Sequence, residues 1–136
     1  MKPVMQTIVR SDQGVGVPGD CLRAAVASMF ELDIIQVPHF LMFGKRWYSA
    51  YHSFLWFLGY ELLDYDCTGK FSRKDLINGC ISACVKSKTF KKDTHAVLVN
   101  SVGRVLHDPN PNQAYKGLNI LKTGDFVGWD VIKKRE

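Results

Sequence analysis

The chain has 136 residues, of which 46% are hydrophobic and 23% charged, and its net charge is +5. This is the size and composition of one globular domain, residues 1–136, with enough core to fold without disulfides or bound metal. No segment has the form of a secretory signal or the roughly 18 consecutive apolar residues of a membrane span, so we expect a cytoplasmic protein with no membrane partner. We therefore expect free thiols at all four cysteines, which are Cys21, Cys67, Cys80 and Cys84.

Basic residues gather at Arg73-Lys74, within residues 86–92, and in the tail Lys133-Lys134-Arg135. Basic surfaces of this kind attract nucleic acid or other acidic partners. No aromatic-interleaved nucleic-acid motif accompanies the charge, so a solvated basic surface is the favoured interpretation and nucleic acid is the alternative.

The first part of the chain predicts a strand at residues 4–9 and then a loop with three glycines and a proline, ending at Gly19. Asp20 is a suitable N-cap residue. From Cys21 to Leu32 apolar residues recur at helical spacing, so a helix is expected to begin at Cys21.

After a loop that Pro38 closes, an aromatic-rich helix is predicted at about residues 46–58, ended by Gly59. A strand at 60–65 follows, and then a short helix that opens with the capping box at Ser72 and stops near Gly79. From there the hydrophobic period changes to two, which predicts strands at residues 80–86, 95–99, 104–107 and 127–133. Helices early and strands late indicate an α+β fold with an antiparallel sheet.

Cys21 stands where a nucleophilic thiol would be activated. Unpaired backbone N–H groups and the helix dipole favour negative charge in the first turn of a helix, and the thiolate is the reactive form. The glycine-rich loop before it allows close approach of a substrate. A cysteine that only packs a helix against a sheet fits this fragment equally well.

Two predicted strands bring a histidine and an aspartate together. His95 opens one strand and Asp108 follows the next. If Val102-Gly103 forms a two-residue hairpin turn, Val97 lies opposite Asp108, and His95 becomes its diagonal neighbour at a Cα distance of roughly 7–8 Å. His107 then points to the opposite face, and a slip of one residue would exchange the roles of His107 and Asp108.

These residues have the chemistry that thiol catalysis needs. Cys21 would attack, His95 would accept and return the proton, and Asp108 would orient the imidazole. The oxyanion donor would be the backbone N–H of Cys21 or the side-chain amide of Gln13. Taken alone, Asp108 before Pro109 also fits ordinary turn chemistry.

Three segments carry a family resemblance: Gly19-Asp20-Cys21-Leu22-Arg23-Ala24-Ala25, Thr94-His95-Ala96-Val97-Leu98-Val99 and Val105-Leu106-His107-Asp108-Pro109. In order and spacing they resemble the bacteriocin-processing (double-glycine leader) peptidases, and most of all the short stand-alone phage and bacterial proteins of that papain-like type. The resemblance spans about residues 13–109. It implies a papain-like fold in which N-terminal helices pack on a C-terminal antiparallel sheet.

The resemblance also implies site residues: a nucleophile at Cys21, a histidine at His95, an aspartate at Asp108 and a glutamine at Gln13. Two positions depart from the family pattern. The family's glutamine usually lies six positions before the cysteine rather than eight, and a small residue usually follows the cysteine where this chain has Leu22. If the protein is phage-encoded, its compartment is the host cytoplasm.

Other chemistry is less well supported. Cys80 and Cys84 form no C-x-x-C pair, and with Ser82 they indicate small side chains packed beneath a helix, so no metal or other cofactor is expected. Aromatic residues crowd the second helix, where they indicate core packing or else the wall of a substrate groove beside Cys21: Trp47, Tyr48, Tyr51, Phe54 and Trp56.

The expected activity is cleavage of a peptide, isopeptide or other amide bond in a peptide or protein substrate, through an acyl-enzyme intermediate. Deamidation or acyl transfer at the same site is the near alternative. The alternative from a different class is a basic, non-catalytic phage-type protein that binds a host protein or nucleic acid.

Overall fold

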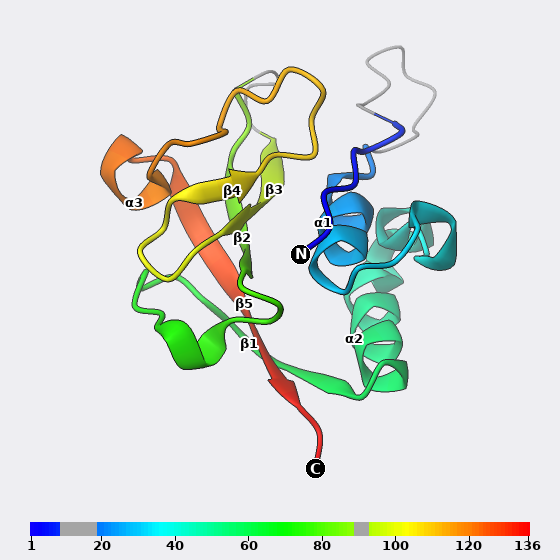
Figure 1. The fold of residues 1–136 in the computed structure, drawn as a ribbon. Coiled ribbons are helices and arrows are strands. Elements are labelled where there is room, and N and C mark those ends of the chain that lie inside the picture. The colour runs from blue at the N-terminus through cyan, green and yellow to red at the C-terminus, as the bar shows by residue number, and fades with distance from the viewer. Residues whose placement is uncertain (9–18, 89–92) are drawn as a thin grey trace.

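The structure is a computed structural model that describes residues 1–8, 19–88 and 93–136. It is α+β, with helices from the N-terminal half packed on an antiparallel sheet of five strands in the order β1-β5-β2-β3-β4. Figure 1 shows α1 and α2 on one side of the sheet and α3 on the other. The elements are α1 (Cys21–Met29), η1 (Ile34–Gln36), η2 (Phe40–Arg46), α2 (Trp47–Phe57), β1 (Tyr60–Asp66), η3 (Arg73–Asp75), β2 (Ile81–Lys86), β3 (Thr94–Val99), β4 (Val105–His107), α3 (Ile120–Thr123) and β5 (Phe126–Lys134).

The sheet has a hydrophobic core on each face. Along β3, Ala96 and Leu98 join the core beneath the helices, whereas Val97 and Val99 join the core on the opposite face, which includes Ile120 of α3. Successive side chains of a strand point to opposite faces, and this explains why β3 is apolar without interruption from Ala96 onward. The period-two pattern therefore correctly predicted the four later strands.

The expected strand at residues 4–9 does not form over the described residues 4–8, and residue 9 lies outside the described range. The N-terminal segment instead runs between α1 and the loop after β4. The Val4 N–H donates to Ser28 Oγ at 2.8 Å, and the Gln6 N–H donates to the Pro109 carbonyl at 3.0 Å. Because these backbone groups bond to a helix side chain and a loop, they make no strand ladder.

Asp20 occupies the N-cap position of α1, but its side chain does not cap the helix. Its Oδ1 accepts the backbone N–H groups of Thr7 at 2.9 Å and Ile8 at 2.8 Å, and its Oδ2 accepts the Thr7 hydroxyl at 2.6 Å. The carboxylate is 1% exposed. It therefore ties the N-terminal segment to the start of α1.

The β3–β4 connection differs from the expected two-residue turn. Asn100 N–H donates to the Arg104 carbonyl at 3.0 Å, so three residues form the loop, and Gly103 takes a φ of +86° in it. A bulge then leaves Leu106 unpaired, because Val99 pairs with Val105 and Leu98 with His107. The bulge offsets the longer turn and restores the pairing of Leu98 with His107 that the predicted register implies.

The helix expected after Ser72 is only the 3₁₀ turn η3. Its capping box forms, with the Ser72 N–H donating to Asp75 Oδ2 at 2.7 Å. It ends early because Leu76 is extended and the Ile77 N–H bonds to the Cys80 carbonyl at 2.8 Å, in an isolated bridge.

No single helix in the described ranges has the length and apolar character to cross a membrane. Two segments taken together, Cys21–Met29 and Ile34–Phe57, have that length and composition, but the pair is bent by 102°.

Asp20→Ala should lower the free energy of unfolding by about 2–4 kcal/mol, because it leaves three donors without their acceptor in a buried place. Asp20→Asn should lose much less. Its carbonyl oxygen can still accept both N–H groups, and the Thr7 hydroxyl can turn to accept from the new amide. Urea denaturation of both variants checks this. Equal losses of stability in the two variants would contradict this account. They would show that the negative charge of Asp20 matters more than its hydrogen bonds, through the nearby Arg23, whose Nη1 lies 3.7 Å from Asp20 Oδ2.

Candidate active site

Cys21 is the first residue of α1, and the helix holds it against the sheet. Ala24, Ala25 and Ala27 are fully buried, and their small side chains let α1 pack closely on β3. The Ala24 N–H bonds to the Asp20 carbonyl at 3.0 Å, so the helix ladder begins at the residue that the N-terminal segment holds in place. The thiol therefore stands at a fixed point, half-buried, where α1 meets the start of β3.

His95 and Asp108 meet as the register predicted. The imidazole Nε2 lies 2.5 Å from Asp108 Oδ1. A carboxylate only accepts, so Nε2 carries the hydrogen. The His95 side chain is 11% exposed and that of Asp108 1%, so the pair is largely shielded from solvent.

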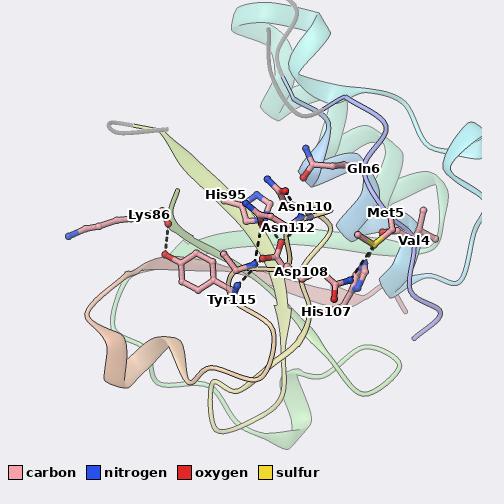
Figure 2. Close-up of polar contacts among 12 residues, drawn as sticks. Val4, Met5, Gln6, Lys86, His95, His107, Asp108, Asn110, Asn112 and Tyr115 are labelled. Carbon is pink, nitrogen blue, oxygen red and sulfur yellow. Dashed lines mark hydrogen bonds and ion pairs between the residues drawn. The ribbon is translucent and has the colours of Figure 1, made fainter. Parts of the chain in front are cut away.

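The Asp108 carboxylate is held on both oxygens by the loop that follows it. Oδ1 also accepts the Asn110 N–H at 2.9 Å, and Oδ2 accepts the Tyr115 N–H at 3.1 Å. The Tyr115 hydroxyl in turn donates to the Lys86 carbonyl at 2.5 Å, at the end of β2. Figure 2 shows this chain of contacts running from His95 through Asp108 to Tyr115 and Lys86.

Cys21 and His95 line the same cavity. The thiol acts on the pKa of His95 through hydrogen bonding and charge, which places it beside the imidazole. Since Asp108 occupies Nε2, Nδ1 is the ring nitrogen left for the thiol. The acid, the imidazole and the thiol thus form a relay in which the carboxylate orients the ring toward sulfur.

The electrostatics of this relay favour a charged imidazole. Burial, the largest influence, lowers the pKa of His95, but hydrogen bonds and charges from Asp108 and Cys21 outweigh it and raise the pKa to about 9. Burial has the opposite effect on an acid and raises the pKa of Asp108, but hydrogen bonds from His95, Asn110 and Tyr115 bring that pKa below its ordinary value. A positive imidazolium next to a thiol stabilises the thiolate, which is the nucleophilic form.

The other predicted residues have different positions. Gln13 lies outside the described residues. His107 is 4% exposed and faces away from the relay, where its Nε2–H donates to the Val4 carbonyl at 2.7 Å (Figure 2). His107 thus holds the N-terminal segment through this hydrogen bond. It pairs with Leu98 in the sheet and takes no part in the contact between His95 and Asp108.

Cys21 and His95 open onto a cavity of about 470 Å³ between α2 and the sheet. Trp47, Tyr48 and Tyr51 of α2 line it, so these three aromatic residues form a wall beside the thiol, as one of the two interpretations anticipated. Tyr51 is also in the core, whereas Trp56 is 46% exposed and outside the cavity lining.

The remaining thiols have surroundings unlike those of Cys21. Cys67 is exposed, and Cys80 is buried, which raises its pKa to about 11. Cys84 lines the cavity, and burial raises its pKa as well. In the described part of the chain, no group of three His, Cys, Asp or Glu side chains is arranged to hold a metal ion.

The sequence interpretation missed Asp130, a carboxylate of β5 that lines the same cavity. Its signal was an acidic residue inside a strand whose neighbours on both sides, Trp129 and Val131, are apolar. Period-two alternation places Asp130 on the face of the helices, but only the fold shows a cavity there.

Stability should depend on pH through His95. Its pKa is raised from 6.5 to about 9, so the folded chain binds this proton more tightly and the contribution is complete below pH 6.5 and lost as the pH rises through 9. The lowered pKa of Asp108 makes its contribution present above 3.8 and lost on acidification. Between pH 6.5 and 10, the wild type should lose up to about 3 kcal/mol relative to His95→Gln, measured by urea unfolding. If the free energy of unfolding changed with pH in the same way for both proteins, the pairing of His95 with Asp108 would be contradicted.

Asp108→Asn should destabilise the fold by about 1–3 kcal/mol, because each carboxylate oxygen accepts a backbone N–H, whereas an amide has only one acceptor oxygen. Whichever way the amide turns, its NH₂ faces the N–H of Asn110 or of Tyr115. Asp64→Asn is the matched control, since that exposed carboxylate accepts the Tyr65 N–H on one oxygen, and one amide oxygen can still do so. Equal melting temperatures for the two variants would show that Asp108 is not held as described.

No protein-family model, curated protein or solved structure matches the chain. The candidate site is therefore identified by its geometry: a thiol at a helix start, an imidazole at a strand start and a buried carboxylate at a strand end.

Proposed function

We propose that this protein is a cysteine hydrolase of the papain-like type, with Cys21 as nucleophile, His95 as general acid and base, and Asp108 as the residue that orients the imidazole. The observation that carries the proposal is the relay from Asp108 Oδ1 through the His95 ring, 2.5 Å away, to the Cys21 thiol at the edge of a cavity. The helix that begins at the thiol and the sheet that supplies the other two residues accord with the papain-like resemblance.

The proposed reaction cleaves an amide bond in two steps. The Cys21 thiolate attacks the carbonyl carbon, and the imidazolium of His95 gives its proton to the departing amine as the C–N bond breaks. The resulting thioester is then attacked by water. His95 takes a proton from that water, and the sulfur leaves as a thiolate when the acid product forms, which restores the thiolate and the imidazolium.

The negative oxygen of each tetrahedral intermediate needs a hydrogen-bond donor. The backbone N–H of Cys21 belongs to the first turn of α1, where N–H groups have no partner in the helix ladder. We assign this N–H as one oxyanion donor, and the Gln13 amide as the proposed second. The substrate class is a peptide or protein, with deamidation and acyl transfer open to the same thioester chemistry.

The test uses p-nitrophenyl acetate, an activated ester small enough to reach any thiol. At pH 6.5 an ordinary thiol is only about 1% thiolate, so Cys21 should be acetylated roughly 10–100-fold faster than Cys67. Nitrophenol release should show a burst and then steady turnover, as the thioester hydrolyses. Cys67 is the internal control, because it is exposed and free.

His95→Ala should remove the advantage of Cys21 over Cys67 and reduce turnover about as far as Cys21→Ala does, because members of such a relay act as a unit. Peptide mapping by mass spectrometry locates the acetyl group. Acetylation of Cys67 ahead of Cys21 would overturn the assignment of Cys21 as the nucleophile. Fast acetylation of Cys21 without turnover would leave a reactive thiol on a binding protein instead of a hydrolase.

A further inference from the structure

A second acidic group shares the cavity with the catalytic relay. Asp130 of β5 lines it together with Cys21 and His95. The Tyr51 hydroxyl donates to Asp130 Oδ2 at 2.8 Å, and the Ser82 hydroxyl is its other side-chain partner. A carboxylate can accept about four hydrogen bonds, so these two donors leave capacity for more.

Asp130 has no cationic partner among the described residues. Within residues 1–8, 19–88 and 93–136, no Lys, Arg or His side chain forms an ion pair with it. Burial raises the pKa of Asp130 to about 6, and the hydrogen bonds from Tyr51 and Ser82 lower it only in part. Carboxylates with little access to water are usually paired with a positive group. Asp130 is half-buried at the cavity wall, so it is placed to accept a positive group that enters the cavity.

The cavity exists because the sheet is lined with small side chains at this place. Cys84 pairs with Ala96 on one side and with Gly128 on the other, which makes a row of small residues across three strands. A Cβ added at Gly128 would lie 2.7 Å from the Tyr65 hydroxyl oxygen, and closer still to the ring. The Tyr65 ring therefore lies against the glycine, at the side of the cavity.

The thiol and the carboxylate line one and the same cavity, together with Cys84. Burial raises the pKa of the Cys84 thiol, and the charges of Asp130 and Cys21 raise it further. The lining also includes the aromatic or aliphatic side chains of Trp47, Tyr48 and Leu41. A cavity with apolar walls that also holds a reactive thiol and an anion fits an extended side chain that is aliphatic along its stem and positive at its tip.

We propose that this cavity is a specificity pocket for lysine, in which Asp130 binds the ammonium group of a substrate side chain next to the scissile bond. The inference rests on the proposed hydrolase function and names its substrate class. Some serine proteases select basic residues in the same physical way, with a carboxylate in the pocket that receives the side chain. The aromatic wall adds cation–π attraction along the path of the ammonium.

Lysine fits better than arginine. A guanidinium is bound best by both oxygens of a carboxylate at once, in a planar fork. The Tyr51 hydroxyl already donates to Oδ2 of Asp130, so the two oxygens are not both free to bind a guanidinium. Burial and the Asp130 charge raise the pKa of Tyr51 well above its usual value, so its hydroxyl stays a donor and does not release this oxygen.

The experiment uses irreversible acyloxymethyl ketone tripeptides that alkylate the catalytic cysteine. The residue next to the warhead, or the one before it, is lysine, arginine, norleucine or glutamate, with alanine elsewhere. Norleucine reproduces the lysine stem without the charge. In the wild type, lysine should exceed norleucine by about 30-fold in inactivation rate at one of the two positions, as a buried charge pair predicts. Arginine should fall between them, and glutamate should be slowest.

Asp130→Asn should bring the lysine-to-norleucine ratio close to one, while the Asn oxygen can still accept the Tyr51 hydroxyl and keep the fold. Asp64→Asn is the matched control, because it changes the net charge equally on an exposed part of β1 that does not line the cavity. It should keep the lysine preference. Melting temperatures verify that both variants are folded.

The outcomes separate the two proposals. If lysine is no faster than norleucine at both positions in the wild type, or if the preference survives Asp130→Asn, the lysine pocket is overturned while the hydrolase stands. If no tripeptide alkylates Cys21 and p-nitrophenyl acetate shows no turnover, the hydrolase fails and the pocket falls with it.

Discussion

The Asp108 carboxylate is the contact on which the site depends, because it collects donors from three separate places. It accepts the His95 imidazole from β3, the Asn110 N–H from the loop after β4, and the Tyr115 N–H further along that loop. The Tyr115 hydroxyl extends the network to the Lys86 carbonyl at the end of β2. A buried carboxylate with all of these partners is rigid, and its negative charge holds a proton on the imidazole. The orientation of His95 and its charge therefore have the same physical cause.

A second buried carboxylate fixes the other half of the site. Asp20 binds the N–H groups of Thr7 and Ile8, and its own backbone starts the hydrogen-bond ladder of α1. Since Cys21 is the next residue, the position of the thiol depends on a contact between segments twelve or thirteen residues apart. A negative charge at Asp20 opposes a thiolate on the next residue, but the Asp20 oxygens bind donors of the N-terminal segment, and the imidazolium of His95 supplies the opposite charge.

Much of the architecture could be predicted from local pattern. The start of α1 at Cys21, the aromatic α2, and the later strands all follow from hydrophobic period and from the residues that end helices. The meeting of His95 with Asp108 was also predicted, from counting residues across a hairpin. That prediction assumed a two-residue turn, whereas the loop has three residues and the bulge at Leu106 removes the difference. The register was right because two local deviations cancel, and a sequence pattern shows neither of them.

Periodicity, glycines and prolines act within a few residues, so the positions of helices and strands follow from local sequence, as do the residue types that have the chemistry of a thiol relay. The roles of the remaining polar groups follow only from the folded structure. Residues 4–8 have strand-like composition, yet their N–H groups bond to Ser28, Pro109 and Asp20. Asp130 is one acidic residue in a strand until α2 covers it and small residues on the sheet leave a cavity. Hydrogen-bond partners and cavities are set by what lies opposite, and this depends on contacts between distant parts of the chain.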